Sequence, residues 1–96
     1  MTRLLITERA ALDIDRLCEF LLDSVPHEAA RTAELVFGAL EILKDHPGLG
    51  HPAAEGCREL VISRGRSGYL ALYLYDDRAD AVSVLAIRHQ REGGYS

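Results

Sequence analysis

The chain has 96 residues, of which 48% are hydrophobic and 27% are charged. This length supports one compact core and is too short for two, so we expect a single domain over residues 1–96. The apolar runs are too short to span a membrane, and the N-terminus lacks the apolar core and cleavage site of a secretory signal. We therefore expect a cytoplasmic protein with no membrane partner.

The formal net charge is −4, and it is unevenly distributed. Residues 1–48 contain five basic and nine acidic residues, whereas residues 49–96 contain six of each. The total charge argues against a polyanionic partner, but the basic clusters of the second half leave a local contact possible. Ten of the eleven basic residues are arginine, the side chain best suited to forked pairing with carboxylates and phosphates.

Two cysteines, Cys18 and Cys57, lack the spacing of a metal or redox pair, and we expect both to be reduced thiols in or near the core. The sequence has no glycine-rich phosphate loop, no helical metalloprotease motif and no paired-cysteine zinc signature. We therefore expect neither a metal nor a cofactor.

The first half of the chain predicts a strand followed by two helices. Residues 3–6 form a short apolar run, and Thr7 can cap the helix that follows. Helical spacing of apolar residues continues to about Ser24, and Pro26 opens a second helix that runs to about Asp45. Because the connection is so short, the two helices must form a hairpin.

The second half predicts a loop and three strands. Two prolines and two glycines mark residues 46–52 as a loop. Strands are expected at 57–63, 69–75 and 81–89, with turns at 65–68 and 76–80. Short connections make neighbouring strands antiparallel. The predicted fold class is α+β, with an N-terminal strand and a helical hairpin packed on an antiparallel β-sheet.

The strand at 69–75 alternates leucine with tyrosine and alanine. Leu70, Leu72 and Leu74 share one face, and we expect that face to meet the helices. The tyrosine face is then at least partly open to solvent, with the tyrosines serving either as contact residues or simply as ordinary sheet formers.

The ordered set of elements resembles the RelE/ParE toxin superfamily, and the resemblance covers essentially the whole chain. It rests on the loop Pro47-Gly48-Leu49-Gly50, on Arg58, on Tyr69 and Tyr73, and on the ending that runs from Ile87 to Tyr95. The resemblance implies a toxin that a cognate antitoxin holds inactive, and it allows a toxin–antitoxin hetero-oligomer.

The resemblance also implies one of two targets. ParE-like relatives inhibit DNA gyrase, and RelE-like relatives cut messenger RNA on the ribosome; because both share the fold, the fold cannot choose between them. The sequence of the strand segment Gly68–Tyr73 and the ending of the chain look closest to the ParE-like branch, so we favour gyrase inhibition. A degenerate, non-toxic antitoxin-binding module is a further alternative.

A gyrase inhibitor needs contact residues and no catalytic ones. Arginine and tyrosine are favoured binding hot spots. The candidate target-binding residues are Arg58, Arg64, Arg66, Tyr73, Arg88, Arg91 and Tyr95.

A nuclease needs a base, an acid and cations that stabilise a phosphorane-like charge. Histidine changes its charge near neutral pH, so His89 suits either proton transfer. Several RelE-like nucleases carry more than one lysine, whereas Lys44 is the only lysine of this chain. Further histidines are available for catalysis, because His46 and His51 lie in a loop that can approach the sheet. The candidate catalytic residues of this alternative are His89, Arg88, Arg91 and Tyr95.

Purely structural roles are also open to the end of the chain. Arg88 can pair with the acidic face of the first helix, and His89 can be a half-buried packing residue. A regular strand would place Arg88 and His89 on opposite faces, unless a bulge intervenes.

Overall fold

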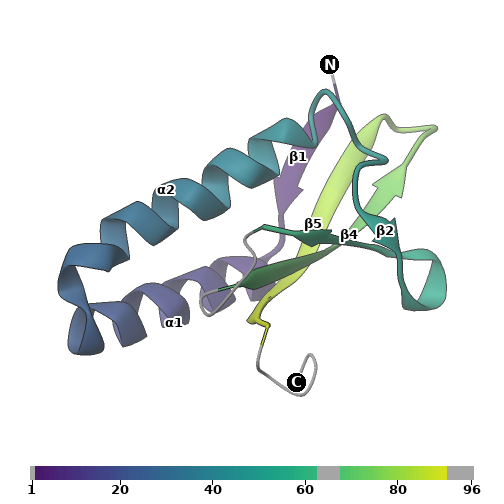
Figure 1. The fold of residues 1–96 in the computed structure, drawn as a ribbon. Coiled ribbons are helices and arrows are strands. Elements are labelled where there is room, and N and C mark those ends of the chain that lie inside the picture. Colours follow the sequence, from purple (N-terminus) through teal and green to yellow (C-terminus); the bar gives the residue numbers. More distant parts are fainter. Residues whose placement is uncertain (1, 63–67, 91–96) are drawn as a thin grey trace.

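The structure is a computed structural model that describes residues 2–62 and 68–90. In chain order, these residues form β1 (Arg3–Ile6), α1 (Glu8–Ser24), α2 (Pro26–Ile42), β2 (His51–Pro52), a single 3₁₀ turn (Ala54–Gly56), β3 (Arg58–Val61), β4 (Tyr69–Asp76) and β5 (Ala81–His89). Figure 1 shows the two helices as a hairpin that extends beyond one end of the sheet.

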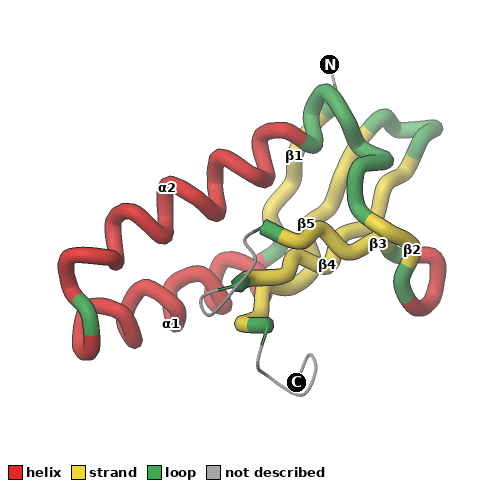
Figure 2. The backbone as a smooth tube through the Cα atoms, viewed as in Figure 1, coloured by secondary structure: helices red, strands yellow, loops and turns green. Residues whose placement is uncertain are grey.

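The strands form one sheet in the order β1-β5-β4-β3-β2. The expected α+β fold is confirmed, with the helical hairpin on the sheet and β3, β4 and β5 as an antiparallel meander. The sheet as a whole is mixed, because β1 runs parallel to β5 at its edge. Figure 2 shows the helices gathered beside the strands. β2 is an addition to the prediction, which assigned these residues to a loop; as the opposite edge strand it tolerates Pro52, which lacks an N–H.

The helical hairpin begins and turns as the sequence predicts. The Thr7 hydroxyl accepts a hydrogen bond from the N–H of Ala10 at 3.2 Å and so caps α1. Only Val25 separates the helices, and Pro26 starts α2. Neither helix of the described chain is long and apolar enough to cross a membrane.

The core lies between the helices and one face of the sheet. That face presents Ala71, Tyr73 and Tyr75 to the helices, whereas Leu74 is 42% exposed on the opposite face. The predicted orientation of this strand was therefore wrong. Alternation groups the residues correctly but does not choose the face, and the tyrosine face is preferred because the Tyr73 hydroxyl finds hydrogen-bond partners inside.

A β-bulge in β5 sets the direction of the last side chains. Leu72 pairs with Ala86 and Tyr73 pairs with Val84, so Leu85 is the extra residue. Val82 and Val84 face the core before the bulge, and Ile87 faces it afterwards. Without the bulge, Arg88 would point toward the helices.

Candidate functional site

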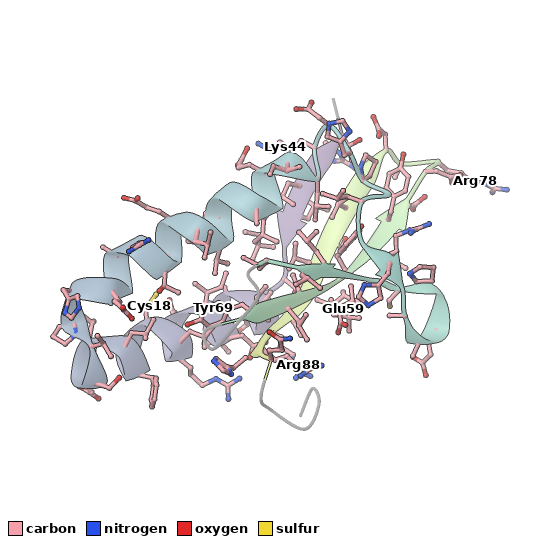
Figure 3. The ribbon with its side chains drawn as sticks, in the orientation of Figure 1. Cys18, Lys44, Glu59, Tyr69, Arg78 and Arg88 are labelled. Carbon is pink, nitrogen blue, oxygen red and sulfur yellow. The ribbon has the colours of Figure 1, made fainter. Side chains whose placement is uncertain are left out.

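Three polar side chains meet on the sheet face that is turned away from the helices, which we call the outer face. Nε2 of His51 lies 3.2 Å from Oε1 of Glu59, and Nη2 of Arg88 lies 3.9 Å from Oε2 of the same carboxylate. The side chains of Glu59 and Arg88 are only 16% and 17% exposed, whereas that of His51 is 56% exposed. Figure 3 labels Glu59 and Arg88.

The strand register brings these residues together. His51 pairs directly with Glu59 between β2 and β3. Glu59 of β3 pairs with Leu72 of β4, and Arg88 of β5 pairs with Leu70 of β4. Leu70 and Leu72 are two residues apart and therefore lie on the same face of β4, so the side chains of Glu59 and Arg88 project from that face as well. The bulge is what gives Arg88 this direction. Sequence reasoning missed Glu59, although its place beside the core residue Leu60 in the β3 alternation marks it as outward-facing.

This constellation couples a half-buried carboxylate to an imidazole and a guanidinium. A carboxylate next to a histidine orients the ring, as an acid–base site requires. The same carboxylate offsets the charge of Arg88 and repels an approaching phosphate. The cluster can thus exchange protons but offers little net positive charge to a nucleic acid.

Of the two roles that the sequence left open for Arg88, pairing with the acidic face of α1 is not the one that the structure shows, because the carboxylate 3.9 Å from its Nη2 is that of Glu59 on β3. His89 lies on the other side of the strand from Arg88, as a regular strand end predicts. Its ring meets the Tyr69 ring edge-on, with centroids 5.4 Å apart, and is half-buried. The structure therefore separates Arg88 and His89, which the nuclease alternative had grouped together.

Tyr69 sits at the junction of the sheet and the hairpin. It is 4% exposed. Burial raises the pKa of the Tyr69 hydroxyl, nearby Glu28 and Cys18 raise it further, and a hydrogen bond with Thr32 acts in the opposite direction. This tyrosine therefore stays neutral well into the alkaline range.

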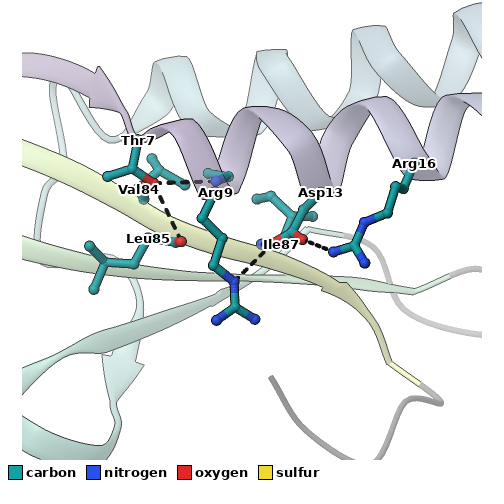
Figure 4. A network of polar contacts seen from close by, with 8 residues as sticks. Thr7, Arg9, Asp13, Arg16, Val84, Leu85 and Ile87 are labelled. Carbon is teal, nitrogen blue, oxygen red and sulfur yellow. Dashed lines mark hydrogen bonds and ion pairs between the residues drawn. The ribbon is translucent and has the colours of Figure 1, made fainter. Parts of the chain in front are cut away.

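Asp13 joins α1 to the end of the sheet. It is 3% exposed; one carboxylate oxygen accepts a hydrogen bond from the Ile87 N–H at 2.9 Å, and the other bonds the guanidinium of Arg16. Nε of Arg9 lies 3.8 Å from the carboxylate. Figure 4 shows this network beside the Thr7 hydroxyl, which donates to the Val84 carbonyl. β1 ends opposite Val84. Beyond that point, Asp13 of α1 accepts the β5 N–H that a neighbouring strand would otherwise bind.

The remaining candidates divide into two groups. Arg58 and Tyr73 lie together on the helix-facing side, where Tyr73 is fully buried and Arg58 is half-buried beneath the loop before β2. Arg64, Arg66, Arg91 and Tyr95 lie outside the described residues. Lys44 pairs with Glu41 at the end of α2, and His46 is exposed in the turn that follows.

Within residues 2–62 and 68–90, no group of three or more histidine, cysteine or acidic side chains is arranged to hold a metal ion. Cys18 and Cys57 are free thiols, and each is half-buried. Cys18 packs against the core, as the sequence predicts.

Comparison with known proteins identifies the family. The profile described as the ParE toxin of the type II toxin–antitoxin system, parDE, matches residues 4–93. The chain belongs to this toxin family. This ParE-family chain is 36% identical over 85 residues to Toxin RelE3 of Caulobacter vibrioides, covering 88% of this chain and 89% of that protein. It is 35% identical over 69 residues to Toxin RelE1 of the same organism, covering 72% and 74%.

Two solved structures share the fold of this ParE-family chain. One is the chromosomal ParDE system from P. aeruginosa, with a TM-score of 0.77, 22% identity and coverage of 93% of this chain and 96% of that chain. The other is the toxin–antitoxin complex RelBE2 from Mycobacterium tuberculosis, with a TM-score of 0.60, 24% identity and coverage of 93% and 98%. These two structures confirm the fold, whereas the family match and the two Caulobacter relatives confirm the RelE/ParE superfamily and its type II toxin class.

Proposed function

We propose that this ParE-family toxin arrests growth by binding DNA gyrase. The observation that carries the proposal is the charge of the outer face, where Glu59 lies within 3.9 Å of the guanidinium of Arg88. Cleaving RNA requires cations aimed at the developing phosphorane charge. A face whose guanidinium is already beside a carboxylate is better suited to a protein surface than to a phosphodiester backbone.

A cognate antitoxin is the second partner that we propose. The family description assigns the toxin to a type II toxin–antitoxin system, and both structural neighbours are toxin–antitoxin assemblies. By analogy, the antitoxin binds the folded toxin in a hetero-oligomer and prevents it from reaching gyrase. Such a pair would serve plasmid stabilisation, because cells that lose the antitoxin are arrested by the toxin.

A second candidate function is ribosome-dependent cleavage of messenger RNA, and one observation favours it. His51 and Glu59 form a histidine–carboxylate pair at 3.2 Å, with Arg88 as the adjacent cation. In this mechanism the imidazole of His51 takes the proton of the ribose 2′-hydroxyl, the 2′-oxygen bonds to phosphorus, and the bond from phosphorus to the 5′-oxygen breaks. The leaving 5′-oxygen takes a proton from water, Glu59 orients the ring, and Arg88 binds the phosphate. The proposed catalytic centre is then His51 and Glu59, rather than His89.

Two assays on the purified toxin separate these functions: gyrase supercoiling and cleavage of message on programmed ribosomes, each with and without the antitoxin. We expect inhibited supercoiling and intact message, with normal supercoiling when the antitoxin is added. Cleaved message with normal supercoiling would replace the gyrase proposal with the nuclease. If the toxin acts in neither assay, the chain is the degenerate antitoxin-binding module.

The variant Glu59→Gln sharpens the comparison. For a nuclease, losing the carboxylate that orients His51 reduces cleavage roughly 100-fold, because a positioned acid–base pair contributes on the order of 10²–10⁴-fold. For a gyrase inhibitor, the substitution removes the carboxylate beside Arg88 and leaves binding equal or stronger. Glu55→Gln is the matched control, since Glu55 is exposed in the neighbouring 3₁₀ turn and should leave either activity unchanged.

A further inference from the structure

The histidine of the outer face stands on the shortest strand of the sheet. β2 consists of His51 and Pro52 alone, and it pairs with β3 at the sheet edge. Two residue pairs are too few to hold a strand by themselves. The His51 side chain is 56% exposed, yet its Nε2 lies 3.2 Å from Oε1 of Glu59. Contacts other than the β2–β3 ladder must therefore help to keep this side chain in place.

The first such contact comes from Tyr73 and reaches the residue directly before His51. The Tyr73 hydroxyl accepts a hydrogen bond from the Gly50 N–H at 2.8 Å and donates one to the Pro47 carbonyl at 2.8 Å. Both hydrogen-bonding roles of the hydroxyl are thus used by the loop. Tyr73 is fully buried, so it binds this backbone from beneath, on the helix-facing side of the sheet.

The second contact comes from Arg58 and holds the other backbone group of Gly50. Nη1 of Arg58 donates to the Gly50 carbonyl at 2.6 Å. A charged donor makes this a stronger bond than one between neutral groups. Arg58 pairs directly with Tyr73 in the β3–β4 register. Two neighbouring side chains of the sheet therefore bind both the N–H and the carbonyl of Gly50.

Gly50 also sets how closely β2 approaches β3. A Cβ at this position would lie 2.8 Å from Oη of Tyr73 and 2.8 Å from the Glu59 carbonyl oxygen. The Gly50 backbone thus packs directly on the residue with which His51 pairs. Because consecutive Cα atoms are about 3.8 Å apart, a shift of Gly50 away from Glu59 carries His51 with it.

We propose that Tyr73 and Arg58 are positioning residues that act through Gly50 to hold the His51 imidazole beside Glu59. This inference rests on the proposed function, in which the outer face meets the target. A side chain that is already held in place loses less conformational entropy on binding, so the two residues beneath it contribute to affinity. The same His51–Glu59 pair is the catalytic centre of the nuclease alternative, where its geometry matters equally.

The test compares Tyr73→Phe with Tyr75→Phe in the full-length toxin. Tyr73→Phe keeps the buried ring and removes both bonds to the loop. Tyr75→Phe removes a hydroxyl from the same strand and face, where its neighbour is Asp80. NMR measures the amide exchange rate of Gly50 and the nuclear Overhauser cross-peaks between the His51 ring and the Glu59 side chain. Urea unfolding records the stability of each variant.

We expect Tyr73→Phe to accelerate Gly50 exchange by about tenfold, the factor that corresponds to one hydrogen bond of ordinary strength. The cross-peaks between His51 and Glu59 should be lost, and Tyr75→Phe should match the wild type in both measurements. Arg58→Met should also lose these cross-peaks. Arg58→Lys should retain part of their intensity, because lysine still offers a charged donor to the Gly50 carbonyl.

The activity measurement uses His51→Ala as its reference. Both His51→Ala and Tyr73→Phe should weaken supercoiling inhibition and growth arrest by about tenfold. Adding Tyr73→Phe to His51→Ala should weaken them no further, although it should lower the urea midpoint equally in the two backgrounds. A purely structural role for Tyr73 predicts instead that activity falls in both backgrounds.

Faster Gly50 exchange with unchanged cross-peaks between His51 and Glu59 would overturn the inference, as would additive losses of activity in the double variant. Full activity of His51→Ala would refute the outer face as the target surface, and the NMR comparison would still decide whether Tyr73 and Arg58 hold the pair. A wild type that arrests growth with normal supercoiling would refute gyrase alone, since growth arrest then serves as the activity in the same comparison.

Discussion

Replacing Asp13 with alanine should be among the most damaging single changes to this fold. The carboxylate is 3% exposed and accepts the Ile87 N–H at 2.9 Å, on the side of β5 where β1 has already ended. Without Asp13, that buried N–H has no acceptor, which costs about 1–3 kcal/mol. The pairs with Arg9 and Arg16 add less than about 1 kcal/mol each, because both guanidiniums are largely in solvent.

We therefore expect the free energy of unfolding of Asp13→Ala to fall by about 2–3 kcal/mol. With a urea m-value of about 1.5 kcal/mol/M, the midpoint of urea unfolding falls by about 1.3–2 M. Asp15→Ala is the control, since Asp15 is exposed on the same helix and should change the free energy by less than about 0.5 kcal/mol. Equal midpoints for the two variants, with the Ile87 amide still protected from exchange, would refute this account of the α1–β5 connection.

Three further predictions concern single positions. Gly50→Ala places a Cβ 2.8 Å from Tyr73 Oη and should destabilise the toxin by about 1–3 kcal/mol, which thermal unfolding measures. Gly38→Ala should do the reverse and stabilise by about 0.8–1 kcal/mol, because Gly38 is exposed within α2 with open space at its Cβ; an unchanged melting temperature would contradict this. Burial raises the pKa of Tyr69, so the folded state keeps this proton to higher pH than the unfolded state, and the free energy of unfolding should decline as pH rises above 10.0. Urea midpoints across that range should decline less steeply for Tyr69→Phe than for the wild type.

The sequence by itself determined the order and type of the main elements. The apolar periodicity, the Thr7 cap and Pro26 specify a hairpin, because the signals that start and stop helices are local. The boundaries of β1 and β5 were likewise predictable from short β-rich runs between turn residues. The family was also accessible from the sequence, since its most specific residues, such as Gly50 and Arg58, are spread over the chain in a fixed order.

Only the tertiary structure decided which way the side chains face. Alternation along β4 groups the leucines and tyrosines equally well in either orientation, and the choice depends on Tyr73 finding partners in a loop more than twenty residues away. The direction of Arg88 depends on the bulge at Leu85, which no local signal marks. The pairing of Glu59 with His51 depends on a two-residue edge strand, which the prolines and glycines of residues 46–52 led us to predict as a loop. Each of these features is set by contacts between distant segments, which a linear pattern does not record.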